Sequence, residues 1–444
     1  MKPSIFADAV ITASSTSDGH SLAQLFAIGG PVAASALLEL GDPRPARIIP
    51  SLRKCSGYLS APWEDMCLHH LLSLYNFSIA SSLTSASAVD AEGKTRSERL
   101  SEAFDEYNSV VTAFLRYFST LTPGRWALPL LRILCLNLRW LAVQADTSNL
   151  ESTAVSTVRT SNQANKRLEE CARQLNKAFT ACIADRNPDI NESRKWGVYE
   201  VVGMVFKTYF RLKSVSLCRN ILRAINAAVL PGLEEFPKSQ QVTFRYYVGV
   251  LAFLNEEYDR AEGELEAALK MCIRSATTNQ TLILVYLIPV KLLRGSLPSP
   301  TLLASPPCQP LHPYYSPFIT ALRTGNVSLF DTTLLDPRIQ RFLVKRGTYI
   351  AIERARDPTL RTLLKKIHSS LPQSSTRLPL SHLRTATSSP LINLKYSQKE
   401  LEWLLATLVF KGYVKGYIAH ERGVLVLSAK DPFPRLANVP LTTT

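Results

Sequence analysis

The segment from Val242 to Lys270 constrains the fold most strongly. It reads VTFRYYVGVLAFLNEEYDRAEGELEAALK, with a short polar turn between two halves that each repeat at three and four residues. Small residues stand where a second helix must approach closely, Gly249 and Ala252 in the first half and Ala261 and Ala268 in the second. Any helical pair in a bundle is the alternative, but the small positions fall in register. The pattern therefore predicts a tetratricopeptide-like helical hairpin.

A single hairpin of this kind cannot bury its own apolar face, so neighbouring helices must stack on it. The candidates are 196–227 and 282–293. Two other stretches, 98–118 and 168–182, carry apolar residues at the spacing of amphipathic helices. No convincing alternating strand occurs in the first three quarters of the chain. We therefore expect a mainly α protein, built as a right-handed stack of helical repeats.

The last hundred residues change in character. Ser397 to Glu400 form a capping box, in which the Ser397 side chain accepts from the third helical N–H and Glu400 reaches back. An apolar stripe follows over 401–409, and Gly412 stands where a left-handed helix cap is needed. These features predict a helix with one buried face.

Two short strands are expected after that helix, KGYIA at 415–419 and VLVLS at 424–428. His420 to Gly423 joins them as a hairpin turn, with glycine available for positive φ. A short helical piece at 380–385 precedes the capped helix. Helix, helix and hairpin in this order predict a C-terminal winged helix.

Polar stretches rich in small residues punctuate the chain and predict loops or linkers; they are 81–97, 146–162, 295–310 and 369–379. The expected organisation is an N-terminal segment that is partly disordered, an N-terminal helical region, the tetratricopeptide-like repeats, the winged-helix module and a flexible tail, over 1–48, 49–190, 191–335, 336–430 and 431–444 respectively.

A helical-repeat stack that runs directly into a winged helix resembles the PCI domain, found in scaffold subunits of the proteasome lid and the COP9 signalosome. The sequence is most similar to the COP9 signalosome subunit 12-like proteins and the PCI subunit of the nuclear mRNA export complex. The resemblance covers roughly residues 160–430. It is carried by YYVGVLAFLNEEYDRAEGELEAAL, TLILVYLIPVKLLRG, FLVKRGTYIAIERA and LEWLLATLVFKGYVKGYIAHERGVLVLS, at 246–269, 281–295, 342–355 and 401–428.

The resemblance implies a scaffold without catalysis and without a cofactor. It implies pairing with a second PCI-domain subunit, winged helix beside winged helix, and binding of a small acidic disordered subunit. It also implies a composite surface for RNA or DNA. We therefore expect a hetero-oligomer with a role in coupling transcription to mRNA export, located in the nucleus, with the cytoplasm as a second location. A signalosome-associated or proteasome-lid-like subunit that meets acidic protein partners is the alternative.

The composition agrees with a protein that meets anionic partners. The 444 residues are 46% hydrophobic, and the net charge is +15, which predicts attraction to nucleic acid, acidic proteins or anionic surfaces. The longest apolar segment, 126–143, contains Arg132 and Arg139 and is expected to be a buried helix, not a membrane span. The N-terminus is a poor secretory signal. No two cysteines have the C-x-x-C spacing, so buried free thiols are predicted for Cys55, Cys67, Cys135, Cys171, Cys182, Cys218, Cys272 and Cys308.

The enzyme motifs that a sequence can show are absent from the chain. It contains no phosphate-binding G-x-x-x-x-G-K-[ST], no G-x-G-x-x-G and no G-x-S-x-G. His69 and His70 are adjacent on an expected helix, so they point to different faces, and one buried and one solvated histidine are predicted. An enzyme with a spatially assembled site remains a separate hypothesis, which an activity screen on the purified subunit would test.

Basic residues of the C-terminal quarter are the main candidate for a binding site. From Arg338 to Arg384, eleven Lys or Arg residues stand against only two acidic ones, Glu353 and Asp357. Cations on one face release counterions from phosphates and give affinity that does not depend on base sequence. The candidate nucleic-acid contacts are Arg338, Arg341, Lys345, Arg346, Arg354, Arg356, Arg361, Lys365, Lys366, Lys411, Lys415 and Arg422. A solvated face or an interface for an acidic protein are the alternatives.

Base-specific reading is not expected at the winged helix. Glu400 and Glu402 stand in the first turn of its candidate recognition helix, where major-groove readers present base contacts. Trp403 and Phe410 flank the apolar stripe of the same helix, and core packing or a protein interface is favoured for them over base stacking.

Overall fold

The computed structural model of the chain describes residues 3–32, 35, 61–83, 88–155, 165–371, 376–388 and 396–441. The chain forms two compact units, Met1–Gln240 and Gln241–Thr444. Within the described ranges it is mainly helical, and its strands all belong to one small sheet near the C-terminus. Mainly α architecture with a C-terminal winged helix is therefore confirmed.

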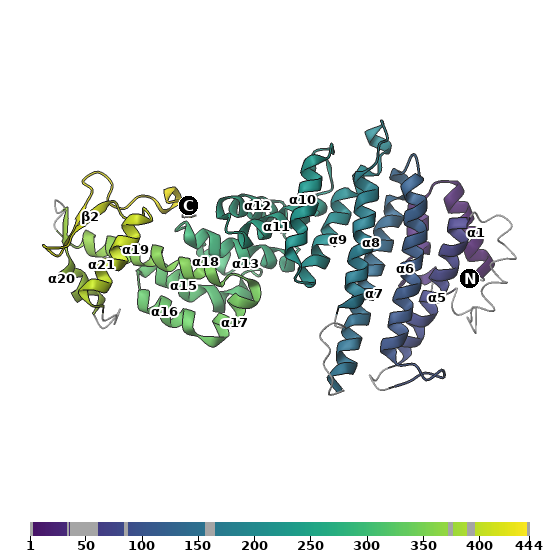
Figure 1. Ribbon diagram of the computed structural model, residues 1–444, viewed down its shortest axis with the longest axis horizontal. Coiled ribbons are helices and arrows are strands. Elements are labelled where there is room, and N and C mark those ends of the chain that lie inside the picture. Colours follow the sequence, from purple (N-terminus) through teal and green to yellow (C-terminus); the bar gives the residue numbers. More distant parts are fainter. Residues whose placement is uncertain are drawn as a thin grey trace. The chain divides into compact units, whose positions relative to one another are not determined.

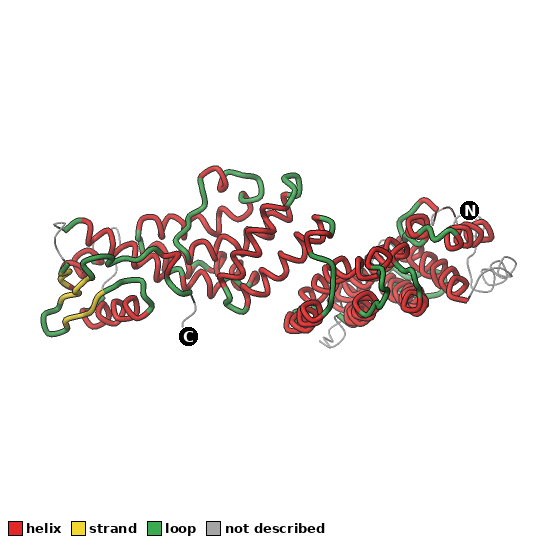
Figure 2. The backbone as a smooth tube through the Cα atoms, turned by 90° about the horizontal axis from the view of Figure 1, so that it is seen from above, coloured by secondary structure: helices red, strands yellow, loops and turns green. Residues whose placement is uncertain are grey.

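The described helices of the first unit are α1 (Pro3–Ser15), α2 (Gly19–Leu25), α5 (Ala61–Ser82), α6 (Arg96–Thr120), α7 (Leu128–Val155), α8 (Lys166–Ile183), α9 (Val198–Arg211) and α10 (Cys218–Ala227). From α5 to α10 the first unit is a row of helices in which neighbours along the chain pack on one another (Figure 1), and α2 packs on α7. Several of them are seen nearly end-on in Figure 2. Helices α6 and α8 contain the amphipathic stripes predicted at 98–118 and 168–182.

Hydrogen bonds between side chains and backbone tie the first helices together inside the core. The Tyr107 hydroxyl on α6 donates to the Phe26 carbonyl at the end of α2, at 3.0 Å. The Asn137 amide on α7 donates to the Tyr107 oxygen at 2.9 Å. Because a buried phenol needs a partner, these bonds fix how α2, α6 and α7 approach one another.

The helical stretch Arg125–Leu150, formed by a short 3-10 turn and most of α7, is long and apolar enough to cross a membrane by length and composition alone. In the structure α7 lies among α2, α6, α8 and α9. Its arginines have polar partners, since Arg132 pairs with Glu200 at 2.6 Å and Arg139 donates to the Thr208 hydroxyl at 3.2 Å. Helix α7 therefore has the contacts of a core helix within this unit.

The predicted helical hairpin opens the second unit. It consists of α11 (Lys238–Leu254) and α12 (Tyr258–Met271), joined by a turn in which Glu256 takes a positive φ of 65°. A Cβ atom at Gly249 would lie 2.8 Å from the Leu265 Cγ atom. Only glycine therefore permits this approach of the two helices, as the register of small residues predicts.

Further helices follow the hairpin, and α13 (Thr277–Leu293) packs on α12 as the stacking argument predicts. Salt bridges join the two, with Lys291 Nζ 2.5 Å from the Glu262 carboxylate. The helices that lead to the winged helix are α14 (Pro300–Leu303), α15 (His312–Thr324), α16 (Val327–Leu335), α17 (Pro337–Arg346), α18 (Tyr349–Arg354) and α19 (Arg356–Ser369).

The winged helix contains α20 (Leu380–Thr387), α21 (Gln398–Phe410) and a three-stranded sheet. Strand β3 (Val424–Leu427) lies between β1 (Arg377–Pro379) and β2 (Gly416–Ala419), antiparallel to both. The capping box at Ser397 and the left-handed Gly412, with φ of 76°, are both present. The apolar faces of α19, α20, α21 and the sheet share one core around Leu378, Leu405 and Leu425.

Three loop predictions need correction. Helix α7 continues to Val155, through the first part of the predicted loop 146–162. Strand β1 lies in the predicted loop 369–379, so the sheet has three strands and not two. Helix α14 and a short 3-10 turn lie in the predicted loop 295–310. Short elements with Ser, Thr and Pro carry little periodicity, and tertiary packing decides them.

The sequence predicts a flexible tail after residue 430. Over its described part, 431–441, Phe433 packs against the winged-helix core and Val439 is only 3% exposed. The Ala437 carbonyl accepts a hydrogen bond from Arg294 at 2.8 Å. These contacts hold the segment on the second unit, although its prolines break any periodic pattern.

Candidate nucleic-acid interface

Helix α17 presents the largest set of exposed cations among the predicted contacts. Asp336 is the N-cap of the helix, and Pro337 is its first helical residue. Gly347 ends the helix in the left-handed conformation, with φ of 72°. Ile339 and Leu343 are buried, so the spacing of three and four residues turns the opposite side outward. The cations on that side are Arg338, Arg341 and Lys345, called here the α17 basic face.

No ion pair joins the α17 basic face to another described residue. Arg346, also exposed, adds a fourth cation in the last turn, where the helix dipole favours positive charge. Exposed apolar side chains lie next to these cations, with Leu335 72%, Val344 62% and Ile350 52% exposed. This part of the surface therefore combines unneutralised charge with apolar contact area.

Two of the predicted contacts serve the fold instead. Arg356 makes a bidentate pair with Asp331, at 2.7 and 2.9 Å, and also donates to the Tyr396 hydroxyl. The hydrogen bonds that Arg356 donates to Asp331 raise the pKa of Arg356. Arg354 pairs with Glu256 and lies over the Tyr258 ring, 5.7 Å from its centroid. Both guanidinium groups thus join α18 and α19 to their neighbours.

Arg361 cannot contact nucleic acid in this conformation, because its side chain is buried and only 7% exposed. Its Nη2 atom donates to the carbonyls of Phe433 and Pro434, at 3.1 and 2.6 Å. Burial lowers the pKa of Arg361. The prediction that Arg361 contacts nucleic acid is therefore wrong for this conformation. Counting charges along the sequence includes Arg361, but its hydrogen-bond partners lie more than seventy residues further along the chain and cannot be inferred from that count.

The remaining predicted contacts differ in whether their charged groups already have a partner within the described structure. Lys365 and Arg422 are exposed and form no ion pair with a described residue, whereas the exposed Lys366 donates to the Thr324 carbonyl at 3.0 Å. Lys411 pairs with Asp357 at 2.7 Å, and Lys415 pairs with Asp431 at 3.3 Å.

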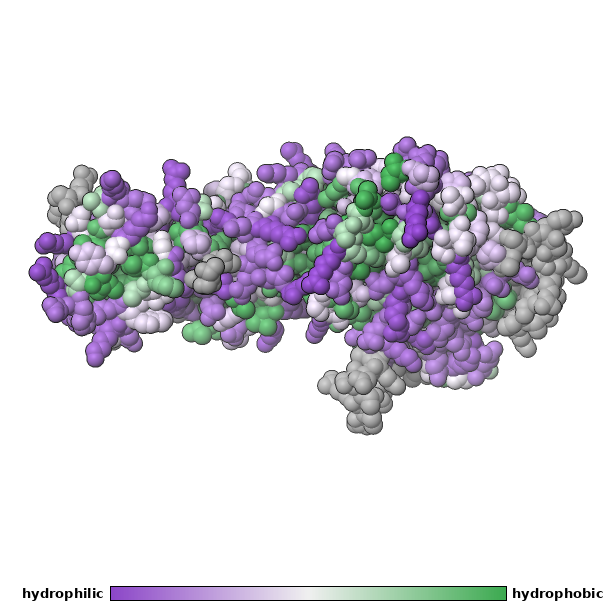
Figure 3. Space-filling view, turned by 45° about the horizontal axis from the view of Figure 1, so that its top comes forward, coloured by the Kyte–Doolittle hydropathy of each residue, from purple (hydrophilic) through white to green (hydrophobic). Residues whose placement is uncertain are grey.

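A cleft in the winged helix brings Arg422 close to a residue outside the predicted set. Arg384 of α20 and Arg422 of the hairpin turn both line it, together with Gln398 and His420, and its volume is about 380 Å³. In Figure 3 hydrophilic side chains protrude around this module, which lies at the left. Arg384 was counted among the basic residues of the region, but only the folded module shows that it shares a cleft with Arg422.

Helix α21 carries its aromatic residues outward. Trp403 is 68% exposed and Phe410 82% exposed, and Tyr417 on the adjoining strand β2 is 64% exposed. Core packing is therefore excluded for Trp403 and Phe410, and a protein interface remains as the favoured explanation. Trp403, Phe410 and the adjoining Tyr417 of β2 are called here the α21 aromatic face, and Leu401, Leu405 and Leu408 hold the other side of α21 in the core.

The acidic residues of α21 have partners on their own module. Glu400 accepts from Ser397 in the capping box, which lowers the pKa of Glu400. Glu402 accepts from Gln398 at 3.1 Å and contacts the His420 ring nitrogen at 2.7 Å, and the bond from Gln398 is the main reason that its pKa is lowered. Both carboxylates therefore stay charged at neutral pH, at the end of the helix where a base reader would meet DNA.

Other titratable side chains of the described ranges do not assemble into a metal site, since no three His, Cys, Asp or Glu residues there are placed to hold an ion. Of the adjacent histidines, His70 is fully buried and His69 lies near the surface, bound to Glu106 at 2.6 Å. The described cysteines are free thiols: Cys67, Cys135, Cys171, Cys182, Cys218 and Cys308 are buried and Cys272 is partly exposed. Cys55 lies outside the described residues.

No protein-family model matches the chain. Individual proteins do. The Protein CSN12 homolog of Mycosarcoma maydis is 72% identical over the full length of both chains. The Protein CSN12 homolog of Neurospora crassa is 37% identical over 75% of this chain and 77% of its own. PCI domain-containing protein 2 of Danio rerio is 28% identical over 97% of each.

These similarities extend through both compact units and agree with the helical stack and winged helix described above. Identity of 72% over whole chains leaves no room for a different fold or family. The chain belongs to the CSN12-like family of PCI-domain proteins.

Proposed function

We propose that the chain is a non-catalytic scaffold subunit of a nuclear complex that couples transcription to mRNA export, and that it contacts RNA or DNA through charge alone. The α17 basic face is the observation that supports this most directly. Its three cations lie within one stripe of a helix and pair with no carboxylate among the described residues. Such a stripe offers phosphates a set of contacts that carries no base preference.

Glu400 and Glu402 support the second half of this proposal. They occupy the start of α21, the element that a base-reading winged helix places in the major groove. Two charged carboxylates there repel the phosphate backbone. The proposal therefore assigns nucleic-acid contact to α17, with Arg384 and Arg422 as a second contact, and not to the recognition helix.

Salt dependence of binding tests this function. Affinity of the full chain for mixed-sequence RNA and DNA is measured across a range of salt concentrations, for wild type and for Arg338→Glu/Arg341→Glu/Lys345→Glu. If each cation contacts one phosphate, the log–log slope falls by about 0.7 to 0.9 per residue, roughly 2 to 3 in total. The matched control reverses three exposed cations elsewhere in the same unit, Arg260, Lys270 and Arg274.

The control has the same net charge as the test variant and should keep most of the wild-type slope. An α17 variant that is folded and binds with an unchanged slope would contradict the nucleic-acid role of this face. Equal loss in both variants would also contradict it, because general charge and not the α17 basic face would then set the affinity.

A small acidic disordered protein is the alternative occupant of the same face. Exposed Leu335, Val344 and Ile350 beside the cations favour a chain that has both acidic and apolar side chains. This alternative fits a signalosome-associated or proteasome-lid-like subunit. Competition between an acidic peptide and bound RNA separates the two functions. If the peptide displaces RNA no better than simple salt at the same ionic strength, the nucleic-acid function stands. If the peptide displaces RNA at fixed salt and low peptide concentration, the protein partner is favoured.

Pairing with a second PCI-domain subunit is the partner proposal for the winged helix, in a hetero-oligomer. The α21 aromatic face supports it, because a Trp and a Phe exposed together are typical of anchors at protein interfaces. Purification of the tagged full chain with Trp403→Ala/Phe410→Ala should lose a co-purifying PCI-domain protein that wild type retains. Val229→Ala/Ile273→Ala, which truncates two other exposed apolar residues, should retain it.

A further inference from the structure

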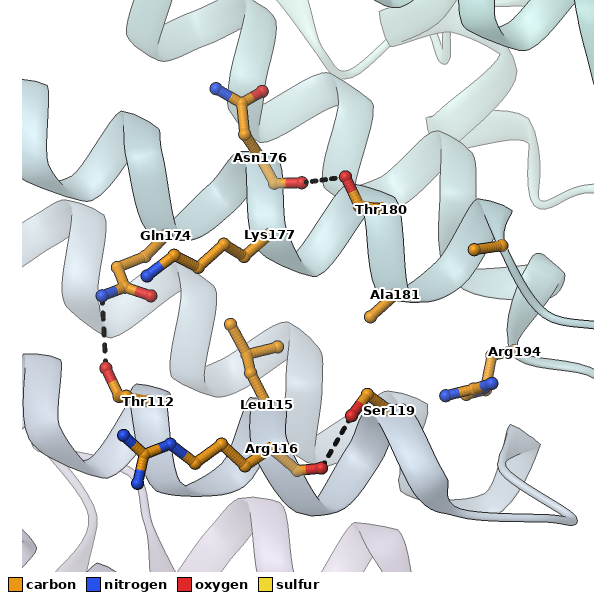
Figure 4. Close-up of a pocket in the computed structure, with 11 residues that line it drawn as sticks. Thr112, Leu115, Arg116, Ser119, Gln174, Asn176, Lys177, Thr180, Ala181 and Arg194 are labelled. Carbon is orange, nitrogen blue, oxygen red and sulfur yellow. Dashed lines mark hydrogen bonds between the residues drawn. The ribbon is translucent and has the colours of Figure 1, made fainter.

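A groove runs between helices α6 and α8 in the first unit, and none of its lining residues belongs to the predicted nucleic-acid contacts. Its volume is about 640 Å³, within the usual range of small-molecule sites. Figure 4 shows its two walls and the side chains that reach into it. The lining residues that carry the argument are Thr112, Leu115, Arg116, Gln174, Lys177 and Arg194.

The helical repeat explains why these residues share one groove. Thr112 and Arg116 lie one turn apart on α6, and Gln174 and Lys177 lie one turn apart on α8. The Gln174 amide donates to the Thr112 hydroxyl at 3.2 Å and closes one end of the groove. Arg194 closes the other end, where it donates to the Phe118 carbonyl and to Asp185.

Positive charge dominates the rim. Arg116 and Lys177 are exposed on opposite walls, and neither forms an ion pair with a described residue. None of the residues that line the groove within the described ranges is a carboxylate. Two cations that face one groove repel each other, and an anion between them removes that repulsion.

Buried polar atoms beneath the rim give a second, independent indication. Gln174 is only 3% exposed, and its Oε1 atom has no hydrogen-bond partner within the described structure. Figure 4 shows that Thr112 is bonded to the amide nitrogen of Gln174 and not to this oxygen. Buried acceptors are normally satisfied, and a hydroxyl group of a ligand would donate to this one.

Apolar surface completes the site. Leu115, Ala181 and Ala184 line the groove between its polar ends, so a ring can pack there. We propose that this groove binds a small phosphate ester with free hydroxyl groups, either a sugar phosphate or a nucleotide. Arg116 and Lys177 hold the phosphate, Gln174 accepts from a hydroxyl, and the ring covers the apolar residues.

Calorimetric titration of the full chain tests the site with four probes: AMP, glucose 6-phosphate, inorganic phosphate and glucose. Both esters should bind, inorganic phosphate at least tenfold more weakly, and glucose not measurably. A preference for AMP identifies a nucleotide site, and a preference for glucose 6-phosphate identifies a sugar-phosphate site.

Two variants test the site, one by removing its positive charge and one by filling its volume. Arg116→Gln/Lys177→Gln removes the charge and should weaken both esters at least tenfold. Ala181→Phe fills the groove with both cations in place and should weaken them as much. The control Arg186→Gln/Arg223→Gln removes two exposed cations of the same unit outside the groove and should bind like wild type.

Circular dichroism checks that each variant is folded. The proposal is overturned if neither ester binds wild type, if inorganic phosphate binds as tightly as the esters, or if the control variant loses as much affinity as Arg116→Gln/Lys177→Gln.

Discussion

At the scale of single residues, the atoms around a guanidinium group decide whether it serves the fold or a ligand. Arg341 and Arg361 stand in the same basic run of the sequence, and nothing local distinguishes them. Arg341 is exposed on α17, whereas Arg361 is buried and binds two backbone carbonyls of the C-terminal segment. The sequence therefore predicts the region of positive charge but not which of its members are available.

Substitution of these two arginines by methionine should have opposite effects. Arg361→Met keeps the apolar stem but leaves two carbonyls without their donor, and should lower the free energy of unfolding by about 1 to 3 kcal/mol. RNA affinity of the folded protein should not change. Arg341→Met should change stability by less than about 0.5 kcal/mol and weaken RNA binding. Urea denaturation and RNA titration at fixed salt measure both properties; weaker RNA binding by folded Arg361→Met would contradict the assignment.

Acid should destabilise the first unit through His70. This side chain is fully buried, and its ring lies 5.1 Å from that of Phe26 and 5.9 Å from that of Phe6. Burial lowers its pKa from 6.5 to about 3. Between these values the unfolded chain binds a proton that the folded chain does not, so stability is complete above pH 6.5 and is lost as the pH falls toward 3. The full loss is roughly 4 to 5 kcal/mol.

Urea unfolding between pH 7 and pH 4 measures most of this loss, and His70→Phe should remove that part while keeping the ring packing. His69 offers a control of opposite sign, because its hydrogen bond to Glu106 raises its pKa. Its contribution is present below the unfolded pKa and lost as the pH rises, so His69→Gln should steepen the acid loss. If His70→Phe kept the full wild-type pH dependence, other groups would have to account for it.

At the scale of elements, the sequence predicts those whose signals are local. The capping box of Ser397 and Glu400, Gly412, and the turn at Gly423 together mark the helix and hairpin of the winged helix, and all are present. Strand β1 could not be predicted, since Arg377–Pro379 has no alternation of its own and becomes a strand only by pairing with β3. Helix α7 likewise continues past residue 146 through residues of poor helix propensity, and its Asp146 accepts from the N–H groups of Arg167 and Leu168, a contact that no local pattern indicates.

Gly249 tests the hairpin of α11 and α12. Gly249→Val places branched carbon atoms against Leu265, whose Cγ atom would lie 2.8 Å from even a single Cβ. The helices must separate, and the free energy of unfolding should fall by about 1 to 3 kcal/mol. Gly263→Ala on α12 is the matched control, because a Cβ there meets no atom within 4 Å and alanine favours a helix. Thermal or urea unfolding compares them, and equal stability of the two variants would contradict close packing at Gly249.

At the scale of the whole molecule, the order of helical stack and winged helix follows from the sequence, because periodicity, caps and turn residues all point to it. The candidate site follows less completely. Arg356 forms an ion pair with Asp331 on another helix, Lys411 forms one with Asp357, and Arg384 and Arg422 line the same cleft. Such pairings depend on which elements pack together. Residues that neighbour each other in the sequence do not indicate which distant elements these will be.

Two compact units should respond separately to local damage. Each has its own packed helices, the first from α1 to α10 and the second from α11 to the sheet, and protein stability is not uniform across such units. Hydrogen exchange of Gly249→Val should therefore accelerate in α11, α12 and α13 while α5 to α8 keep wild-type rates. His70→Ala should do the reverse, since it leaves a cavity among Phe6, Phe26 and Tyr107. Exchange that accelerates by the same factor in both units, for either variant, would show that the chain unfolds as one cooperative body.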